Sequence, residues 1–293
     1  MKGIRLRSFL FLPAYNTKYF QKAMESDADA IILDMEDSVP ISRKEEARRI
    51  IIGYSQQHQL NGKMIFVRVN QLDTIDFWHD INELICEGID GIMPAKIESE
   101  QDIVFLDRVI SHIELAKHIA PRTIQLAPLI ETAKAVQNVD SIAQASDRLT
   151  SLCLGGEDYL NDIGTIYTYQ ESALVYPRAK LVNAARANGL LPIDTPYLKI
   201  NDMEGFRKSC SRAYRDGFAG NLILTPKQIM IANKTFLPNE EEVQKAEEVL
   251  RCLSNQQEAG VKNLEGQVVG PPMEKRAKNV WRQIHIGDYT RYI

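Results

Sequence analysis

Cysteine and histidine are sparse in this chain of 293 residues, which contains four cysteines and five histidines. The cysteines are widely spaced and form no CxxC pair, and the histidines form no HExxH pattern. Zinc sites and disulfide frameworks need such residues at recognisable spacings. We therefore expect reduced, mostly buried thiols, with no zinc site and no Cys/His nucleophile pair. Because the sequence also lacks a signal-like start, we expect a cytoplasmic protein.

Long apolar runs and basic blocks are absent too. Runs such as residues 8–13 and 30–33 are far shorter than the roughly 20 residues needed to cross a bilayer. The 35 Lys and Arg residues are outnumbered by 39 Asp and Glu residues, which gives a formal net charge of -4. Proteins that bind along nucleic acids concentrate cations against the phosphates. We expect neither a membrane nor a nucleic acid partner. The composition does not exclude small anionic ligands.

Short apolar runs alternate with amphipathic segments over most of the chain, which predicts strands joined by helices. The eight candidate strands are Ser8–Leu12, Ala30–Leu33, Met64–Val69, Gly91–Pro94, Thr123–Leu129, Ser151–Leu154, Leu190–Ile193 and Asn221–Leu224. The helical patterns between them are Thr17–Ser26, Ser42–Gln57, Thr74–Cys86, Ser99–Ile119, Thr132–Ala145, Ser172–Ala187, Asp202–Asp216 and Lys227–Lys234. Eight such units favour an α/β fold of the closed (β/α)₈ TIM barrel type, with a doubly wound open sheet as the alternative.

The length admits either two average domains or one barrel with an addition. The strand count favours a TIM-barrel catalytic domain over residues 1–235 and a C-terminal helical extension over residues 236–293. Within the extension, one amphipathic helix opens at Pro238, and Met273–Ile284 is helical again. We expect the extension to cover the barrel mouth or to contact a neighbouring subunit. Of the helix start signals, Ser42 with Glu45 has the best capping-box spacing.

Charged residues follow most of the apolar runs, at the strand ends where a TIM barrel places its chemistry. In chain order they are Asp34, Glu36, Asp37, Arg68, Lys96, Glu131, Glu157, Asp158 and Asp194. Carboxylates gathered in one concave site repel one another unless a cation lies among them. Arg68 and Lys96 offset part of this repulsion.

A hard divalent cation accounts for the rest, because no histidine or cysteine lies near these strand ends and carboxylates with water suit Mg²⁺. Glu131 and Asp158 are the best pair of metal ligands, since they follow neighbouring strands. Gly155 and Gly156 beside Asp158 permit close backbone approach. The alternative is that the two carboxylates form salt bridges to the nearby cations without metal.

Arg68 and Lys96 each admit two interpretations. The planar guanidinium of Arg68 suits a substrate carboxylate, but Arg68 is alternatively a buried structural partner of Asp34 or Asp37. Lys96 is alternatively a Schiff-base nucleophile, which needs burial and depressed basicity.

Six ordered motifs resemble the citrate lyase β-subunit family of the HpcH/HpaI aldolase superfamily, which includes malyl-CoA and citramalyl-CoA lyases. The motifs are Arg7-Ser8-Phe9-Leu10-Phe11-Leu12-Pro13, Ile32-Leu33-Asp34-Met35-Glu36-Asp37-Ser38-Val39, Phe66-Val67-Arg68-Val69-Asn70, Pro94-Ala95-Lys96-Ile97-Glu98-Ser99, Leu129-Ile130-Glu131-Thr132-Ala133 and Leu154-Gly155-Gly156-Glu157-Asp158-Tyr159. The resemblance runs from about residue 7 to residue 284.

The resemblance implies a TIM barrel, assembled as a homotrimer or a hexamer, that uses Mg²⁺ to cleave or form a carbon–carbon bond next to a thioester. By position, Glu131 and Asp158 would be the Mg²⁺ ligands, and Arg68 with Glu131 would bind the carboxylate of the acid product. The substrates would be a keto acid such as oxaloacetate, pyruvate or glyoxylate, and an acyl-CoA or acyl-carrier thioester.

Four further residues acquire expected roles from the same resemblance. Glu36 and Asp37 would order metal-bound water and Arg68, which makes them candidate catalytic residues with Arg68. Phe11 and Lys22 lie at positions that resemble CoA-contacting ones in the malyl-CoA lyase branch.

The thioester half of the site departs from the family pattern. Gly270 lies where relatives commonly have an Asp that acts as acid or base across a subunit boundary. Asn221 replaces a frequent Lys, Thr225 precedes Pro226 where relatives usually carry His, and Lys18 replaces an Arg. Two alternatives to the thioester lyase therefore remain: a CoA-independent keto-acid aldolase or decarboxylase, and a catalytically impaired keto-acid-binding subunit.

Overall fold

The structure of the chain is a computed structural model that describes residues 6–57, 63–166, 172–254, 262–264 and 267–284. The chain forms two compact units. The large one comprises Leu6–Asn233, and the described part of the small one lies between Lys234 and Ile284.

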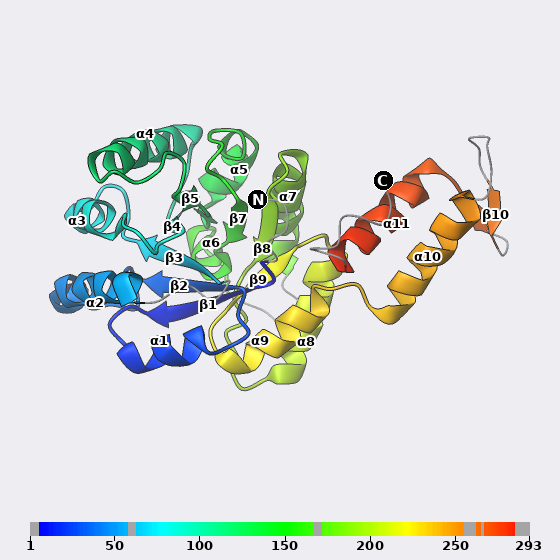
Figure 1. The fold of residues 1–293 in the computed structure, drawn as a ribbon, viewed down its shortest axis with the longest axis horizontal. Helices are drawn as coiled ribbons and strands as arrows, with labels where there is room; N and C mark the ends of the chain where they lie inside the picture. Colours follow the sequence, from blue (N-terminus) through cyan, green and yellow to red (C-terminus); the bar gives the residue numbers. More distant parts are fainter. Residues whose placement is uncertain (1–5, 58–62, 167–171, 255–261, 265–266, 285–293) are drawn as a thin grey trace. The chain divides into compact units, whose positions relative to one another are not determined.

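The large unit is built on parallel strands, most of which are joined by helices (Figure 1). The strands are β1 (Ser8–Pro13), β2 (Ala30–Asp34), β3 (Met64–Val69), β4 (Gly91–Pro94), β5 (Gln125–Leu126), β6 (Leu129–Ile130), β7 (Ser151–Leu154), β8 (Leu191–Asp194) and β9 (Gly220–Ile223). Their order is β5-β4-β3-β2-β1-β9-β8-β7-β6.

The strands at the two ends of this order, β5 and β6, are consecutive in the chain and separated by only two residues. The sheet therefore closes into a barrel. β5 pairs with β4 and β6 pairs with β7. Leu126 also bridges directly to Leu149 beside β7. Pro128 separates β5 from β6 because proline has no N–H for the ladder, so the single strand expected over Thr123–Leu129 is split. The prediction of a closed barrel rather than an open sheet is confirmed.

Helices connect the strands, and each predicted helical pattern is present. The helices are α1 (Thr17–Met24), α2 (Lys44–Gln57), α3 (Ile75–Leu84), α4 (Glu100–Ala116), α5 (Ala133–Ile142), α6 (Gly156–Asp162), α7 (Val175–Ala187), α8 (Met203–Arg215) and α9 (Pro226–Thr235). The predicted helices are shorter than their patterns except α9, which extends one residue further at each end. Short 3₁₀ turns, Ile41–Arg43 and Ser172–Leu174, lead into α2 and α7. The short helix α6 was not predicted.

The capping box expected at Ser42 is wrong. Pro40 begins a 3₁₀ turn over Ile41–Arg43 without a side-chain cap, so Ser42 lies inside the turn. Pro40 is the N-cap of this turn, and its carbonyl accepts from the Arg43 N–H at 2.8 Å. The capping box forms instead at α4, where the Ser99 hydroxyl accepts from the Asp102 N–H and the Asp102 carboxylate accepts from the Ser99 N–H.

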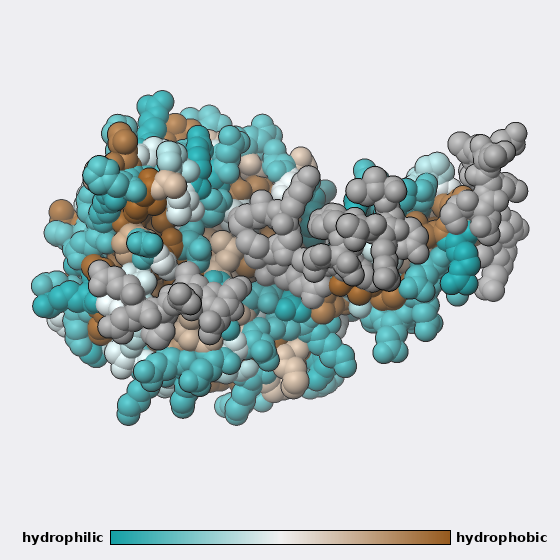
Figure 2. Space-filling model, in the orientation of Figure 1, coloured by the Kyte–Doolittle hydropathy of each residue, from teal (hydrophilic) through white to brown (hydrophobic). Residues whose placement is uncertain are grey.

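Side chains fill the interior of the barrel. A buried cluster includes Phe9, Ile32, Phe66, Met93 and Leu129, each at most 2 % exposed. Because this interior is packed with side chains, we expect the functional site at an end of the barrel rather than inside it. The outer surface is mostly hydrophilic on the face shown in Figure 2.

The small unit pairs two helices, α10 (Glu240–Ser254) and α11 (Pro271–Ile284), with a hairpin of β10 (Lys262–Leu264) and β11 (Gln267–Val269). Its core contains Ala246, Val249, Val269 and Ala277. The sequence predicted both helices but not the hairpin. In the part of the chain that the structure describes, none of the helices has the length and apolar character of a membrane span.

Candidate active site

Arg68 and Asp34 form a bidentate ion pair at the carboxyl ends of two neighbouring strands. β2 and β3 pair with Asp34 opposite Arg68. The guanidinium Nε lies 2.6 Å from Asp34 Oδ1, and Nη2 lies 2.7 Å from Oδ2. Burial by itself would raise the pKa of Asp34, but the Arg68 guanidinium outweighs it and holds the pKa below its usual value. Both groups are therefore charged at neutral pH.

Asp34 also orders the loop that follows β2. Its Oδ1 accepts from the Glu36 N–H at 2.9 Å, and its Oδ2 accepts from the Ser38 N–H at 3.2 Å. The loop brings Glu36 Oε2 within 3.0 Å of Arg68 Nη1, whereas Asp37 lies 3.8 Å away and its side chain is 72 % exposed. Burial raises the pKa of Glu36, and the charges of Asp37 and Asp34 add to that effect.

The contacts of Arg68 leave one edge of its guanidinium available. Arginine has five N–H donors in a planar fork. Asp34 takes the donors on the Nε–Nη2 side and Glu36 faces Nη1, so one N–H on each terminal nitrogen has no partner among the residues that the structure describes. The Phe11 ring lies with its centroid 5.2 Å from Arg68 Cζ, which is within cation–π range. Both interpretations of Arg68 are thus compatible: it pairs with Asp34 and keeps two donors for a carboxylate.

Glu131 follows β6 and is 2 % exposed. The Lys96 backbone N–H donates to its Oε1 at 2.7 Å. On the other side, a Cβ on Gly155 would lie 2.4 Å from Glu131 Oε2 and 2.5 Å from its Cβ. Only glycine fits there, so the close approach expected of Gly155 is made to Glu131.

Lys96 contributes its backbone rather than its ammonium group. The residue has a φ of 50°, and its side chain is exposed. The Schiff-base interpretation is therefore wrong, since it required a buried lysine.

Negative charge dominates around Glu131. Burial, followed by the charges of Asp158 and Glu36, raises the pKa of Glu131 to about 8, against the opposing effects of the Lys96 N–H and the Arg68 charge. Asp158 lies half-buried in the first turn of α6. The Asp158 charge thus acts directly on Glu131, as expected of two groups at one site.

These carboxylates fit a divalent cation. A cation between Glu131 and Asp158 would remove the repulsion that now favours protonation of Glu131. No cluster of three or more Asp, Glu, His or Cys side chains with metal-binding geometry occurs among the described residues. Mg²⁺ needs no such cluster, because it typically takes one or two protein carboxylates and completes its shell with water and substrate oxygens.

Two further sequence candidates belong to other elements. Lys22 is exposed in the last turn of α1, the first helix after β1. Gly270 belongs to the small unit, where its carbonyl accepts from the Met273 and Glu274 N–H groups at 2.9 and 3.1 Å and so begins α11.

Sequence reasoning missed a buried lysine beneath the loop that follows β2. Lys44 is 7 % exposed, and its Nζ donates to Met35 O at 3.0 Å and to Asn70 Oδ1. Asn70 in turn donates to Asp80 Oδ2 at 2.6 Å. Lys44 therefore ties the loop that carries Glu36 to the end of β3. Its place within the α2 pattern gave no signal, because helical lysines usually face solvent.

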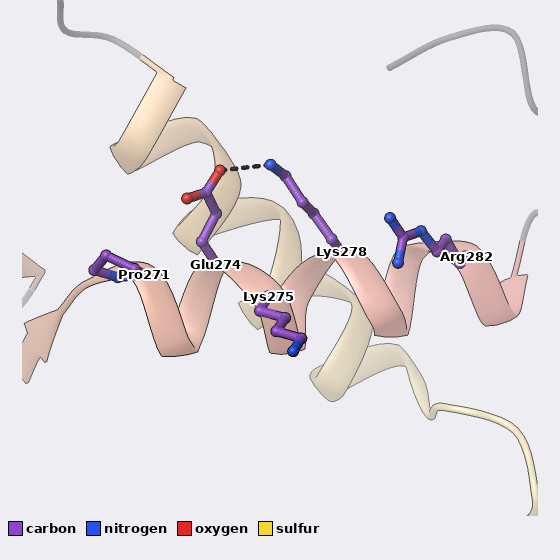
Figure 3. Close-up of a pocket in the computed structure, with 5 residues that line it drawn as sticks. All are labelled: Pro271, Glu274, Lys275, Lys278 and Arg282. Atoms are coloured by element: carbon purple, nitrogen blue, oxygen red, sulfur yellow. Dashed lines mark ion pairs between the residues drawn. The ribbon is translucent and has the colours of Figure 1, made fainter. Parts of the chain in front are cut away.

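A separate hollow of about 250 Å³ lies on α11 and is lined by Pro271, Glu274, Lys275, Lys278 and Arg282 (Figure 3). Its three cationic side chains are exposed, and Glu274 pairs with Lys278 at 2.7 Å. Solvated charges of this kind define no binding site on their own.

A TIM barrel with a fixed guanidinium and paired carboxylates at its strand ends is equipped for reactions of small organic acids. Residues 7–226 match the HpcH/HpaI aldolase/citrate lyase family. The chain belongs to this family, and the prediction of a lyase of the citrate lyase β-subunit type is confirmed.

Relatives and a solved structure support the same placement. The chain is 31 % identical to citrate lyase subunit beta of Haemophilus influenzae over 96 % of this chain and 97 % of that protein. It is 34 % identical to L-malyl-CoA/beta-methylmalyl-CoA lyase of Rhodobacter capsulatus over 94 % of each. The crystal structure of CitE from Mycobacterium tuberculosis with magnesium, acetoacetate and coenzyme A matches 97 % of this chain and 99 % of that one, with 26 % identity and a TM-score of 0.79.

Proposed function

We propose that the protein is a Mg²⁺-dependent carbon–carbon lyase that cleaves or forms a hydroxy-carboxyl acyl thioester such as citryl-, citramalyl- or malyl-CoA. The products of cleavage would be an acyl thioester and a keto acid. The observation that supports this most directly is the concentration of the Glu131, Asp158 and Glu36 carboxyl groups beside a guanidinium that keeps two donors unused by the described residues.

Glu131 and Asp158 would hold the Mg²⁺ ion. When bound, the ion supplies Lewis-acid stabilisation of the negative charge that develops on the keto oxygen during carbon–carbon bond cleavage. Glu36, 3.0 Å from Arg68, would position that guanidinium and water near the ion. Asp37 would contribute more weakly, because its exposed carboxylate is screened by solvent.

Arg68 would bind the carboxylate of the keto acid through its remaining Nη1 and Nη2 donors. The Asp34 pair and the Phe11 ring fix the guanidinium plane before substrate arrives. Such preorganisation avoids an entropic cost at the moment of reaction.

The thioester half of the proposal rests on Phe11 and Lys22, and on the coenzyme A in the similar CitE structure. A CoA or acyl-carrier thioester would leave as an enolate that needs a proton. With glycine at position 270, that proton has to come from a group other than a carboxylate there. Assembly into a homotrimer or hexamer remains a prediction, which light scattering on the purified protein measures.

A coupled assay tests the proposal. Citryl-CoA, citramalyl-CoA and malyl-CoA are each supplied with Mg²⁺, and keto-acid release is followed. We expect turnover of at least one thioester that EDTA abolishes and that Arg68→Lys lowers by about 100-fold, because lysine lacks the fork. Lys227→Met, on the exposed side of α9, is the control and should retain full activity.

Two other outcomes would overturn the thioester assignment. Cleavage or decarboxylation of free hydroxy or keto acids, unaffected by Lys22→Ala, would identify a CoA-independent enzyme. Binding of a keto acid with no turnover of any substrate would identify an impaired subunit.

A further inference from the structure

We propose that Thr195 and Asn221 are positioning residues that set the affinity of the site for its divalent cation by fixing the first turn of α6. That turn carries Asp158, so this inference rests on the proposed function.

The start of α6 lacks a cap of its own. The first N–H groups of a helix have no acceptor within the helix and are usually satisfied by a Ser, Thr, Asp or Asn at the N-cap. The N-cap of α6 is Gly155, which forms no side-chain cap. Gly155 has to be glycine because a Cβ there would collide with Glu131 at 2.4 Å. The close approach to Glu131 therefore removes the residue type that would otherwise stabilise this helix start.

Thr195 supplies the missing acceptor from another strand. It directly follows β8, is buried, and its Oγ1 accepts from the Gly156 N–H at 2.9 Å. The two residues are also in tight contact, since a Cβ on Gly156 would lie 2.6 Å from Thr195 Oγ1 and 3.1 Å from Cβ and Cγ2. The first turn of α6 is thus held both by a hydrogen bond and by packing.

Asn221 holds Thr195 in turn. It is 1 % exposed in β9, and its Nδ2 donates to Thr195 O and to Leu222 O, each at 2.8 Å. β8 and β9 pair with Asp194 opposite Asn221. A rigid strand of the barrel therefore connects, through two buried polar side chains, to the N-terminus of α6.

Asp158 lies two residues beyond Gly156 in the same turn. Mg²⁺ demands near-ideal octahedral geometry with oxygens about 2.0–2.1 Å away. A small displacement of the turn would move Asp158 relative to Glu131, which is fixed separately by Lys96 N at 2.7 Å. Loss of the Thr195 acceptor should therefore lower the affinity for the cation while the protein stays folded.

The test compares Thr195→Val, which keeps the shape and removes the acceptor, with Thr195→Ser, which restores it. Mn²⁺ is the probe, titrated by calorimetry or electron paramagnetic resonance without substrate. We expect the valine variant to bind Mn²⁺ about 10–100-fold more weakly, as partners behind metal ligands usually do. The serine variant should recover the wild-type affinity, and Asn221→Leu should weaken binding in the same direction.

Thr150→Val is the matched control, because Thr150 is a buried threonine at the opposite end of β7 whose hydroxyl donates to Leu126 O at 3.4 Å. It should leave Mn²⁺ affinity unchanged. In turnover assays Thr195→Val should raise the Mg²⁺ concentration for half-maximal rate, with kcat largely restored at saturating Mg²⁺.

The outcomes separate this inference from the proposed function. Wild-type protein that binds no Mn²⁺ would overturn both. Wild-type protein that binds Mn²⁺ with Thr195→Val equally tight would overturn the positioning role alone. If circular dichroism shows that the valine variant is unfolded, Thr195→Ala is titrated with Mn²⁺ instead. A wild-type affinity of the alanine variant for Mn²⁺ would also contradict the positioning role.

Discussion

Asp34→Asn is the sharpest test of how the fold holds Arg68. The substitution keeps the side-chain shape but replaces one oxygen by an NH₂ group. Four N–H donors converge on the Asp34 carboxylate: two from Arg68 and the backbone N–H groups of Glu36 and Ser38. An asparagine oxygen serves two of them, so two donors would face another donor.

The expected loss follows from burial. The Asp34 and Arg68 side chains are 4 % and 13 % exposed, and removing one partner of such a buried pair costs about 3–5 kcal/mol. That is a large part of the roughly 5–15 kcal/mol by which proteins are stable. Because the guanidinium also loses its fixed plane, kcat/KM for the thioester should fall by about 100-fold.

Asp29→Asn provides a matched control at the opposite end of β2. Asp29 binds Arg7 in a similar two-bond arrangement at 2.7 and 2.8 Å, with side chains 12 % and 16 % exposed. Its loss should cost stability and leave the kinetics of the folded enzyme unchanged.

Urea unfolding followed by tryptophan fluorescence measures both variants. The chain has two tryptophans, so in a Trp281→Phe background the remaining Trp78 of α3 reports the barrel alone. The role of Asp34 in holding Arg68 is refuted if the free energy of unfolding of Asp34→Asn lies within about 1 kcal/mol of the parent value. It is also refuted if Asp29→Asn lowers kcat/KM as much as Asp34→Asn does.

Three further predictions follow. Gly155→Ala should cost about 1–3 kcal/mol through overpacking and weaken Mn²⁺ binding, because its methyl group displaces Glu131; unchanged binding by calorimetry would contradict this. Burial alone would raise the pKa of Glu114, but two bonds from Arg148 at 2.6 and 2.8 Å hold it below 4.5. Its stabilisation is thus complete above that value and is lost as the pH falls through the lower folded-state pKa; Glu114→Gln should flatten the fall in unfolding free energy below pH 4.5, and an unaltered acid profile would refute this. Gly270→Asp should preserve folding, because Gly270 begins α11 and aspartate is a favoured N-cap; cleavage gained only in this variant would show that the parent is an impaired subunit, whereas an active parent excludes that alternative.

The barrel was predictable because its strands are buried on both sides and therefore appear as continuous apolar runs. Ala30–Asp34 and Met64–Val69 have this form and were found almost to the residue. The fifth strand was predicted whole, although Pro128 divides it. The helix α6 was missed, since Gly155-Gly156-Glu157-Asp158 resembles a strand end followed by a loop.

The charged residues of the candidate site could be proposed from the sequence because the barrel topology brings all carboxyl ends of its strands to one rim. Arg68 and Glu131 needed no other information. Lys44, which bonds the loop that carries Glu36, and Thr195, which accepts from the first turn of α6, were not found. Their hydrogen bonds to Asn70 and to Gly156 join chain segments distant in sequence. Local sequence patterns do not predict hydrogen bonds of this kind.

The Asp34–Arg68 pair has a consequence for how this protein can diversify. The donors proposed for the keto acid belong to an ion pair between neighbouring strands, so most substitutions that alter acid recognition also destabilise the barrel. Of the two contacts proposed for the thioester, Phe11 lies in β1 beside Arg68, whereas Lys22 is exposed on α1, where substitutions are tolerated. Substitutions that change the preferred acyl carrier should therefore be tolerated readily. Substitutions that change the preferred keto acid should require stabilising substitutions elsewhere in the barrel.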